Sequence, residues 1–122
     1  MRRSAAHAVL LLAVLVCGAA AFSRAARPSC IVFDLDGCLW SPEMYELWGR
    51  GGSPFVDGPD GTMLTCNGET VRLLGDARDV LRDLRATGIM AGISSRTDEP
   101  AWARELLDRF DVDGTPLADF FT

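Results

Sequence analysis

Residues 29–37 read SCIVFDLDG, an apolar run that ends in two aspartates and a glycine. The run has the length of one strand and shows no alternation of polar and apolar side chains. This pattern predicts a strand that is buried on both faces, as in a parallel sheet covered by helices. Such a strand also needs a neighbour on each edge. We therefore expect an α/β fold with residues 31–35 inside its sheet.

Two helical patterns and a second apolar run follow along the chain. Residues 77–87 carry apolar side chains at spacings of three and four and stop at Gly88, which predicts a helix closed by glycine. Residues 89–94 form another short strand, and Thr97 or Asp98 is expected to cap a second helix. The side chains expected to face inward are Ala77, Val80, Leu81, Leu84, Trp102, Leu106, Leu107 and Phe110. Strand, helix, strand and helix in this order make the βαβ unit of a parallel fold.

The segment between the first strand and the first helix has a different composition. Residues 39–61 are rich in Gly, Pro and Asp and predict an irregular, exposed excursion. Asn67-Gly68 then predicts a β-hairpin. Four aromatic residues of this segment either screen a site and contact an aryl phosphate or pack under the long loop. They are Trp40, Tyr45, Trp48 and Phe55.

Asp34 and Asp36 lie at the carboxyl end of the first strand, where open α/β sheets bind ligands. Positions i and i+2 of a strand point to the same side, so both carboxylates are expected to face one pocket. Two such carboxylates suit Mg²⁺, which keeps several waters and takes one or two carboxylates. Asp34 can attack phosphorus to form an aspartyl phosphate, and Asp36 can act as general acid and then base. A solvated strand end is the alternative, but the apolar run and Gly37 favour a site.

Residues 94–97, SSRT, occupy the equivalent position after the second strand. A serine hydroxyl together with the amides of a helix N-terminus can hold a phosphate group. Arg96 can add a bidentate contact to the same group. The alternative is an ordinary helix cap with Arg96 as a surface charge. Together with Asp34, these residues favour phosphate binding.

The first 30 residues differ from the rest and predict a targeting leader. Residues 1–21 combine Arg2-Arg3, an apolar run and a small-residue cleavage site, which predicts a signal peptide. A membrane anchor is the alternative, but the run is shorter than the roughly 20 residues that a span requires. Residues 22–30 resemble a transit peptide, so the whole leader resembles the bipartite leaders of secondary plastids. We expect entry into the secretory pathway, then secretion, the ER lumen or a plastid, and no stable membrane span in the mature chain.

Charge and cysteine content narrow the possible partners and metals. Residues 31–122 carry eight arginines and all 17 acidic residues, a formal charge of −9. This balance argues against a nucleic-acid partner, because phosphate neutralisation needs clustered cations. Cys30, Cys38 and Cys66 lie beyond the leader, an odd number with no zinc-type spacing, and the only histidine is His7. Any metal is therefore expected to have oxygen ligands.

Two motifs resemble those of a known family. Residues 33–40, FDLDGCLW, resemble the first motif of haloacid dehalogenase (HAD) superfamily hydrolases, and the final tryptophan is similar to that of the magnesium-dependent phosphatase branch. Residues 93–97, ISSRT, resemble the second motif of that branch, where the serine before the arginine binds the phosphoryl oxygen. The similarity extends over about residues 30–122, so residues 31–122 are expected to be the N-terminal part of a HAD-like phosphatase domain.

The resemblance implies a fold, an activity and a set of residue roles. The fold would be a Rossmannoid parallel sheet with helices on its faces, a small flap or hairpin insert and no cap domain. The activity would be Mg²⁺-dependent hydrolysis of phosphomonoesters, either phosphotyrosine or a small sugar phosphate. Asp34 would be the nucleophile and a Mg²⁺ ligand, and Asp36 the general acid/base that gives its main-chain carbonyl to the metal. Ser95, or else Ser94, would bind the phosphate, and Arg96 would contact the substrate.

The chain also departs from the pattern that it resembles. Cys38 stands where the superfamily usually has Thr or Val, and we expect it to be a buried structural residue. The lysine of a third motif and the acids of a fourth have no counterpart before Thr122, and the chain contains no lysine. Losing one electrostatic stabiliser costs about 3–4 kcal/mol, or roughly 10²–10³-fold in rate.

We therefore expect an incomplete fold with little or no turnover from these residues alone. Two alternatives stay open. One is a catalytically inactive phosphate-binding fragment, a pseudophosphatase. The other is a chain whose remaining motifs are encoded beyond Thr122.

Overall fold

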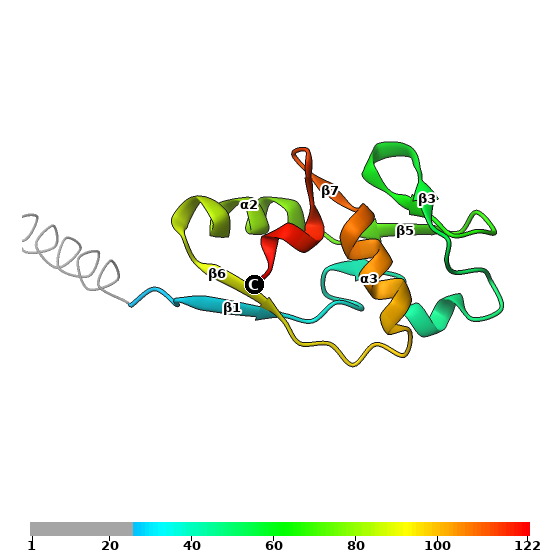
Figure 1. Cartoon of the computed structure of the whole chain (residues 1–122), viewed down its shortest axis with the longest axis horizontal. Coiled ribbons are helices and arrows are strands. Elements are labelled where there is room, and N and C mark those ends of the chain that lie inside the picture. The colour runs from blue at the N-terminus through cyan, green and yellow to red at the C-terminus, as the bar shows by residue number, and fades with distance from the viewer. Residues whose placement is uncertain (1–25) are drawn as a thin grey trace, which may run out of the picture.

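The predicted parallel pair of strands is present in the computed structural model, which describes residues 26–122. Strand β1 (Cys30–Phe33) pairs in parallel with β6 (Met90–Ile93), with Phe33 opposite Ile93. The two strands lie side by side and leave the sheet at the same end (Figure 1). The expected α/β class and the parallel pairing are confirmed. The predicted signal peptide, residues 1–21, and residues 22–25 lie outside the described residues.

Both predicted helices are present. Helix α2 (Ala77–Thr87) ends at Gly88, whose φ of 71° places it in the left-handed region that glycine adopts without strain. Helix α3 (Pro100–Arg109) begins later than predicted, because Glu99 is the N-cap and Pro100 takes the first helical position. Proline is favoured there, since the first turn does not need its missing N–H. None of the helices within residues 26–122 is both long enough and apolar enough to cross a bilayer.

The segment predicted to be irregular and exposed consists of short elements and turns, and many of its residues are exposed, but it also places several apolar side chains in the core. It holds β2 (Trp40–Ser41), the 3₁₀ turns η1 (Met44–Leu47) and η2 (Pro59–Gly61), and β3 (Val56–Asp57). Strands β4 (Met63–Leu64) and β5 (Thr70–Leu73) form the hairpin predicted around Asn67-Gly68 and complete a four-stranded sheet in the order β2-β5-β4-β3. The prediction of exposure is wrong for the apolar residues that are spaced among the turn residues. Those fully or almost fully buried are Leu39, Trp40, Met44, Leu47 and Phe55.

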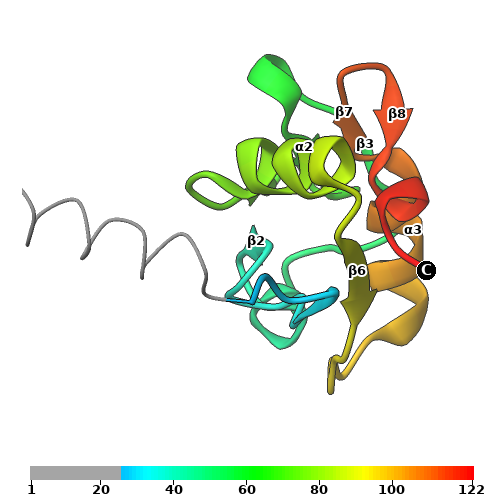
Figure 2. The ribbon, with the colours of Figure 1, turned by 90° about the vertical axis from the view of Figure 1, so that its left-hand side faces the viewer.

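The core fills the space between this antiparallel sheet and the two helices. Trp40 stacks on Phe110 at the end of α3, with ring centroids 6.2 Å apart, and Phe55 meets Trp102 edge to face. Figure 2 shows α2 above β6 and α3 beside it. The chain closes with the hairpin β7 (Asp111–Val112) and β8 (Thr115–Pro116) and the 3₁₀ turn η3 (Leu117–Phe120).

Within residues 26–122, only one of the two faces of the parallel sheet β1-β6 is covered by other elements. Val32 is 60% exposed and Met90 51% exposed, whereas Ile31 and Phe33 are half-buried against the core. The prediction that this strand is buried on both faces is therefore wrong for residues 26–122. Val80, predicted to face inward, is also exposed. The physical reason is that none of the elements within residues 26–122 packs on this face or pairs with the outer edge of β1.

Candidate active site

A cavity of about 200 Å³ lies where β1 and β6 end. Three segments contribute to it: the turn after β1, the start of η1 and the loop between β6 and α3. The lining residues are Asp34, Asp36, Glu43, Tyr45, Ser95, Arg96, Thr97 and Asp98. The fold thus brings the four predicted site residues, Asp34, Asp36, Ser95 and Arg96, into one cavity although 59 positions separate Asp36 from Ser95.

Asp34 is the first residue after β1 and is exposed to solvent. Its Oδ1 atom accepts a hydrogen bond from the backbone N–H of Leu35 at 2.8 Å. None of the hydrogen bonds or ion pairs within residues 26–122 uses the second oxygen, Oδ2. The carboxylate is therefore oriented through one oxygen and can offer the other to a ligand.

Asp36 is held more firmly than Asp34. Its Oδ1 accepts a hydrogen bond from the indole Nε1–H of Trp40 at 2.8 Å, and its Oδ2 accepts one from the backbone N–H of Met44 at 3.0 Å. The turn that follows Asp36 depends on Gly37, whose φ of 71° is in the region that favours glycine. Both carboxylates line the same cavity, as predicted, although they lie just beyond the end of β1.

The loop after β6 presents Ser95 and Arg96 to the cavity, while Ser94 is not among the lining residues. The backbone N–H of Ser94 instead continues the sheet, donating to the carbonyl oxygen of Phe33 at 2.8 Å. Arg96 is exposed, and no hydrogen bond or ion pair within the described part of the chain uses its guanidinium. Of the two serines, Ser95 is thus the one placed to contact a ligand.

The expected cradle of helix amides is not present at this cavity. Helix α3 starts only at Pro100, which has no N–H, and none of its residues lines the cavity. The loop is held by two side-chain contacts instead. The Oγ atom of Ser95 accepts a hydrogen bond from the N–H of Thr97, and Oγ1 of Thr97 accepts one from the N–H of Glu99, both at 3.3 Å.

The charge of the lining favours a cation. Asp34, Asp36, Glu43 and Asp98 supply four carboxylates, against the single guanidinium of Arg96. A phosphate group would be repelled by this set unless a cation stood between them. Oxygen-rich, acidic linings suit Mg²⁺, which also binds substrate phosphates. Within residues 26–122 no three His, Cys, Asp or Glu side chains converge on one metal position, so water and a phosphate oxygen would complete the coordination.

Sequence reasoning missed three lining residues and identified a fourth only as part of an aromatic group. Glu43, Thr97 and Asp98 had no signal beyond their closeness to the two motifs. Tyr45 belongs to η1, and the carboxylates of Glu43 and Glu46 raise the pKa of its hydroxyl above the ordinary value.

Cys38 was expected to be buried and is exposed, as are Cys30 and Cys66. It follows Gly37 in the turn after β1, where its backbone N–H donates to the carbonyl oxygen of Leu35. The turn directs the neighbouring Leu39 and Trp40 into the core and leaves the thiol at the surface.

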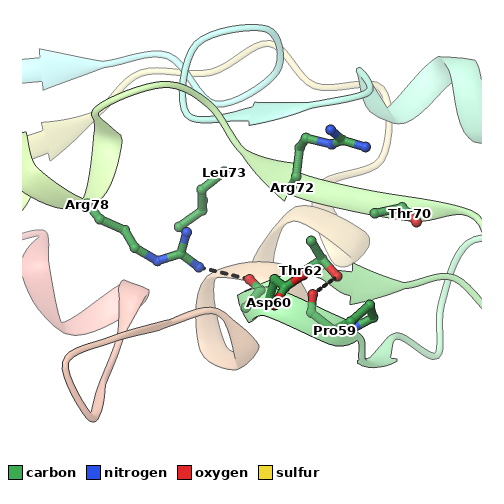
Figure 3. Close-up of a pocket in the computed structure, with 8 residues that line it drawn as sticks. Pro59, Asp60, Thr62, Thr70, Arg72, Leu73 and Arg78 are labelled. Atoms are coloured by element: carbon green, nitrogen blue, oxygen red, sulfur yellow. Dashed lines mark hydrogen bonds between the residues drawn. The ribbon is translucent and has the colours of Figure 1, made fainter.

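A larger cavity of about 440 Å³ lies between η2, β5 and the start of α2 (Figure 3). Its best-placed donors are already used by the chain. Arg78 donates to the carbonyl oxygen of Gly61 at 2.8 Å, and Thr62 Oγ1 donates to that of Pro59 at 2.6 Å. Figure 3 also shows the guanidinium groups of Arg72 and Arg78 well apart. The polar side chains of this cavity therefore stabilise the turn η2, and the cavity lacks the paired carboxylates of the smaller one.

The hydrogen bond from Trp40 to Asp36 gives a first prediction. Replacing Trp40 with phenylalanine keeps an aromatic ring in the core but removes the indole N–H that orients the Asp36 carboxylate. A hydrogen bond to a charged group contributes about 1.5–3 kcal/mol. We expect the free energy of unfolding, measured in urea at pH 7, to fall by about that amount. The measurement is repeated with Trp40→Phe in the Asp36→Asn background. If the free energy of unfolding fell by the same amount there, the hydrogen bond to the Asp36 carboxylate would not be the cause.

The chain is similar to known phosphatases and hydrolases. The sequence model of the acid phosphatase family matches residues 26–122. Human magnesium-dependent phosphatase 1 is 35% identical over 85 residues, which cover 70% of this chain and 47% of that protein. A HAD-like hydrolase superfamily protein of Schizosaccharomyces pombe is 30% identical over 103 residues, 78% of this chain and 57% of that protein. The chain thus spans about half the length of the curated relatives it matches. It belongs to the acid phosphatase family of the HAD superfamily.

Proposed function

We propose that residues 26–122 are the N-terminal part of a Mg²⁺-dependent phosphatase that lacks a cap domain and hydrolyses phosphomonoesters through an aspartyl phosphate. The observation that carries the proposal is the meeting of Asp34, Asp36, Ser95 and Arg96 in one cavity at the ends of two parallel strands. Membership of the acid phosphatase family and the names of the two relatives support it.

The reaction would take place in two steps. In the first, the free oxygen of Asp34 forms a bond to phosphorus, the bond from phosphorus to the leaving oxygen breaks, and Asp36 gives that oxygen a proton. In the second, Asp36 takes a proton from water, whose oxygen bonds to phosphorus and releases Asp34 and inorganic phosphate. The donors at Trp40 and Met44 keep the Asp36 carboxyl group in one orientation for both transfers.

Each remaining group has a binding role in this proposal. Ser95 and Arg96 hold the phosphoryl oxygens, Ser95 through its hydroxyl and Arg96 through two parallel N–H donors. Mg²⁺ would be held by the Asp34 carboxylate and the main-chain carbonyl of Asp36, and it would neutralise the phosphate charge. The substrates would be phosphomonoesters of the phosphotyrosine or sugar-phosphate type, with the leaving group toward the open side of the cavity.

A phosphate-binding fragment without turnover is the second candidate, because Arg96 is the only cationic side chain that lines the cavity. The two candidates differ in what happens after binding. A phosphatase releases inorganic phosphate and alcohol from a chromogenic phosphomonoester, whereas a binding fragment is only stabilised by it.

Dependence on the metal gives a second prediction, because the lining is acidic. In thermal unfolding of the full chain, Mg²⁺ is expected to raise the melting temperature, and inorganic phosphate to raise it further only when Mg²⁺ is present. At a ligand concentration about 100 times Kd, the expected stabilisation is about 2.7 kcal/mol. Arg96→Ala should weaken the phosphate effect, while Arg104→Ala serves as a control, since Arg104 is exposed on α3 and does not line this cavity. Equal stabilisation by phosphate in EDTA would instead favour a metal-free phosphate-binding fragment.

A further inference from the structure

Two exposed aromatic side chains stand beside the candidate active site. Tyr45 is 47% exposed and Trp48 55% exposed, and every other aromatic residue within residues 26–122 is buried or half-buried. Their rings meet edge to face, with centroids 6.4 Å apart and planes at 71°. An exposed apolar surface next to a polar cavity is typical of ligand contact.

The two rings have different relations to the cavity. Tyr45 is one of its lining residues, together with Asp34 and Ser95. Trp48 does not line the cavity but contacts the Tyr45 ring edge to face. Tyr45 is thus the ring that a bound phosphomonoester would meet, and Trp48 is its support.

The turn that carries both rings is tied to both motifs of the site. At its start, the N–H of Met44 donates to Asp36 at 3.0 Å. Just after its end, the indole Nε1–H of Trp48 donates to Oε1 of Glu99 at 3.0 Å, and Glu99 follows the loop of Ser95 and Arg96. A ring fixed in this way before the ligand arrives loses little conformational entropy on binding.

The chemistry of the ring limits what it can select. The Tyr45 side chain is uncharged at neutral pH, as tyrosine ordinarily is, and does not repel a phosphate dianion. Its face offers apolar, polarisable surface but no cation. A flat aromatic leaving group gains stacking contact with such a face, whereas a short aliphatic group gains little.

We propose that Tyr45 determines the leaving-group specificity of this site, with Trp48 as its positioning residue, so that phosphate monoesters of aromatic alcohols bind in preference to those of aliphatic alcohols. The inference rests on the proposed function, since it assumes that the phosphoryl group sits against Asp34, Ser95 and Arg96.

Two non-hydrolysable ligands test the inference by binding alone. Phenylphosphonate and ethylphosphonate share the phosphonate group and differ in the flat ring. Their Kd values for the full chain are measured in Mg²⁺ by titration calorimetry, with the indole N–H of Trp48 followed by NMR. We expect phenylphosphonate to bind about three- to tenfold more tightly than ethylphosphonate. The ratio of the two Kd values should fall to about one in Tyr45→Ala and stay high in Tyr45→Phe, which keeps the ring.

The role of Trp48 is tested by the same ratio of the two Kd values. A general loss of stability does not change this ratio, because it weakens the binding of both ligands alike. Trp48→Ala should lower the ratio, and Trp48→Phe should restore part of it. Equal Kd values in the unmodified chain, or an unchanged ratio in Tyr45→Ala, would overturn the inference and leave the phosphate pocket intact. If neither phosphonate bound in Mg²⁺, the proposed function would fail and the inference with it.

Discussion

Asp34→Asn is expected to eliminate covalent phosphorylation of the chain by a phosphomonoester in Mg²⁺. The asparagine keeps the size of the side chain but replaces the nucleophilic carboxylate oxygen, whose lone pair must form the bond to phosphorus. Loss of a catalytic nucleophile costs several orders of magnitude, on the order of 10³-fold or more. The measurement is mass spectrometry of the acid-quenched protein, with the added phosphate counted on the peptide that contains residue 34.

This readout suits the chain because it needs one bond-forming event and not repeated turnover. Asp83→Asn is a matched control, because Asp83 is exposed on α2 and no side-chain hydrogen bond or ion pair within residues 26–122 uses its carboxylate. The control should be phosphorylated like the unmodified chain. Phosphate found on Asp34→Asn at an unreduced level, or on the Asp36 carboxylate, would refute the assignment of the nucleophile.

The parts of the fold that the sequence predicted are those in which local pattern and final packing agree. The helix before Gly88 carries its apolar side chains at helical spacing, and Leu81 and Leu84 are indeed buried. Asn67-Gly68 gives a hairpin because Gly68, with φ 85°, adopts a conformation that other residues avoid. In these places the residues that decide the structure are neighbours in sequence.

Prediction failed where burial depends on distant segments. The chain around Phe55 has the composition of a loop, yet Phe55 is buried against Trp102, and its backbone N–H donates to Oε1 of Glu105 on α3 at 2.7 Å. The reverse error concerns Val32, whose apolar character predicted burial that no element within residues 26–122 provides. Contacts of this kind depend on which segments meet, and residue spacing does not contain that information.

The residues of the candidate site likewise divide into those that local sequence pattern predicts and those that depend on contacts between distant segments. Asp34, Asp36, Ser95 and Arg96 were predictable because each lies within three residues of the end of β1 or β6, and parallel strands bring their carboxyl ends together. Glu43 and Tyr45 flank Met44, whose N–H donates to Asp36, and both line the same cavity. That contact joins an irregular segment to the first motif and has no periodic signal.

The second large effect is expected from the core. Phe110 is fully buried, stacks on Trp40 and ends α3, where its N–H donates to the carbonyl oxygen of Leu106 at 2.8 Å. Phe110→Ala removes the ring and leaves a cavity that the surrounding helix and sheet can fill only in part. Such replacements cost about 3–5 kcal/mol. We expect the free energy of unfolding, from urea denaturation followed by circular dichroism, to fall by that amount, which is a large fraction of the total for a small domain.

Phe120→Ala is the control of the same type, because Phe120 is half-buried and its ring lies 3.8 Å from the guanidinium carbon of Arg85. Its loss should be nearer 1 kcal/mol, as for a cation–π contact at an exposed position. Equal losses in the two variants would contradict the placement of Phe110 in the core. Since Trp40 packs on Phe110 and also donates to Asp36, the cavity should further broaden the NMR signal of the Trp40 indole N–H. The same aromatic stack that stabilises the fold thus also fixes the orientation of the proposed acid/base.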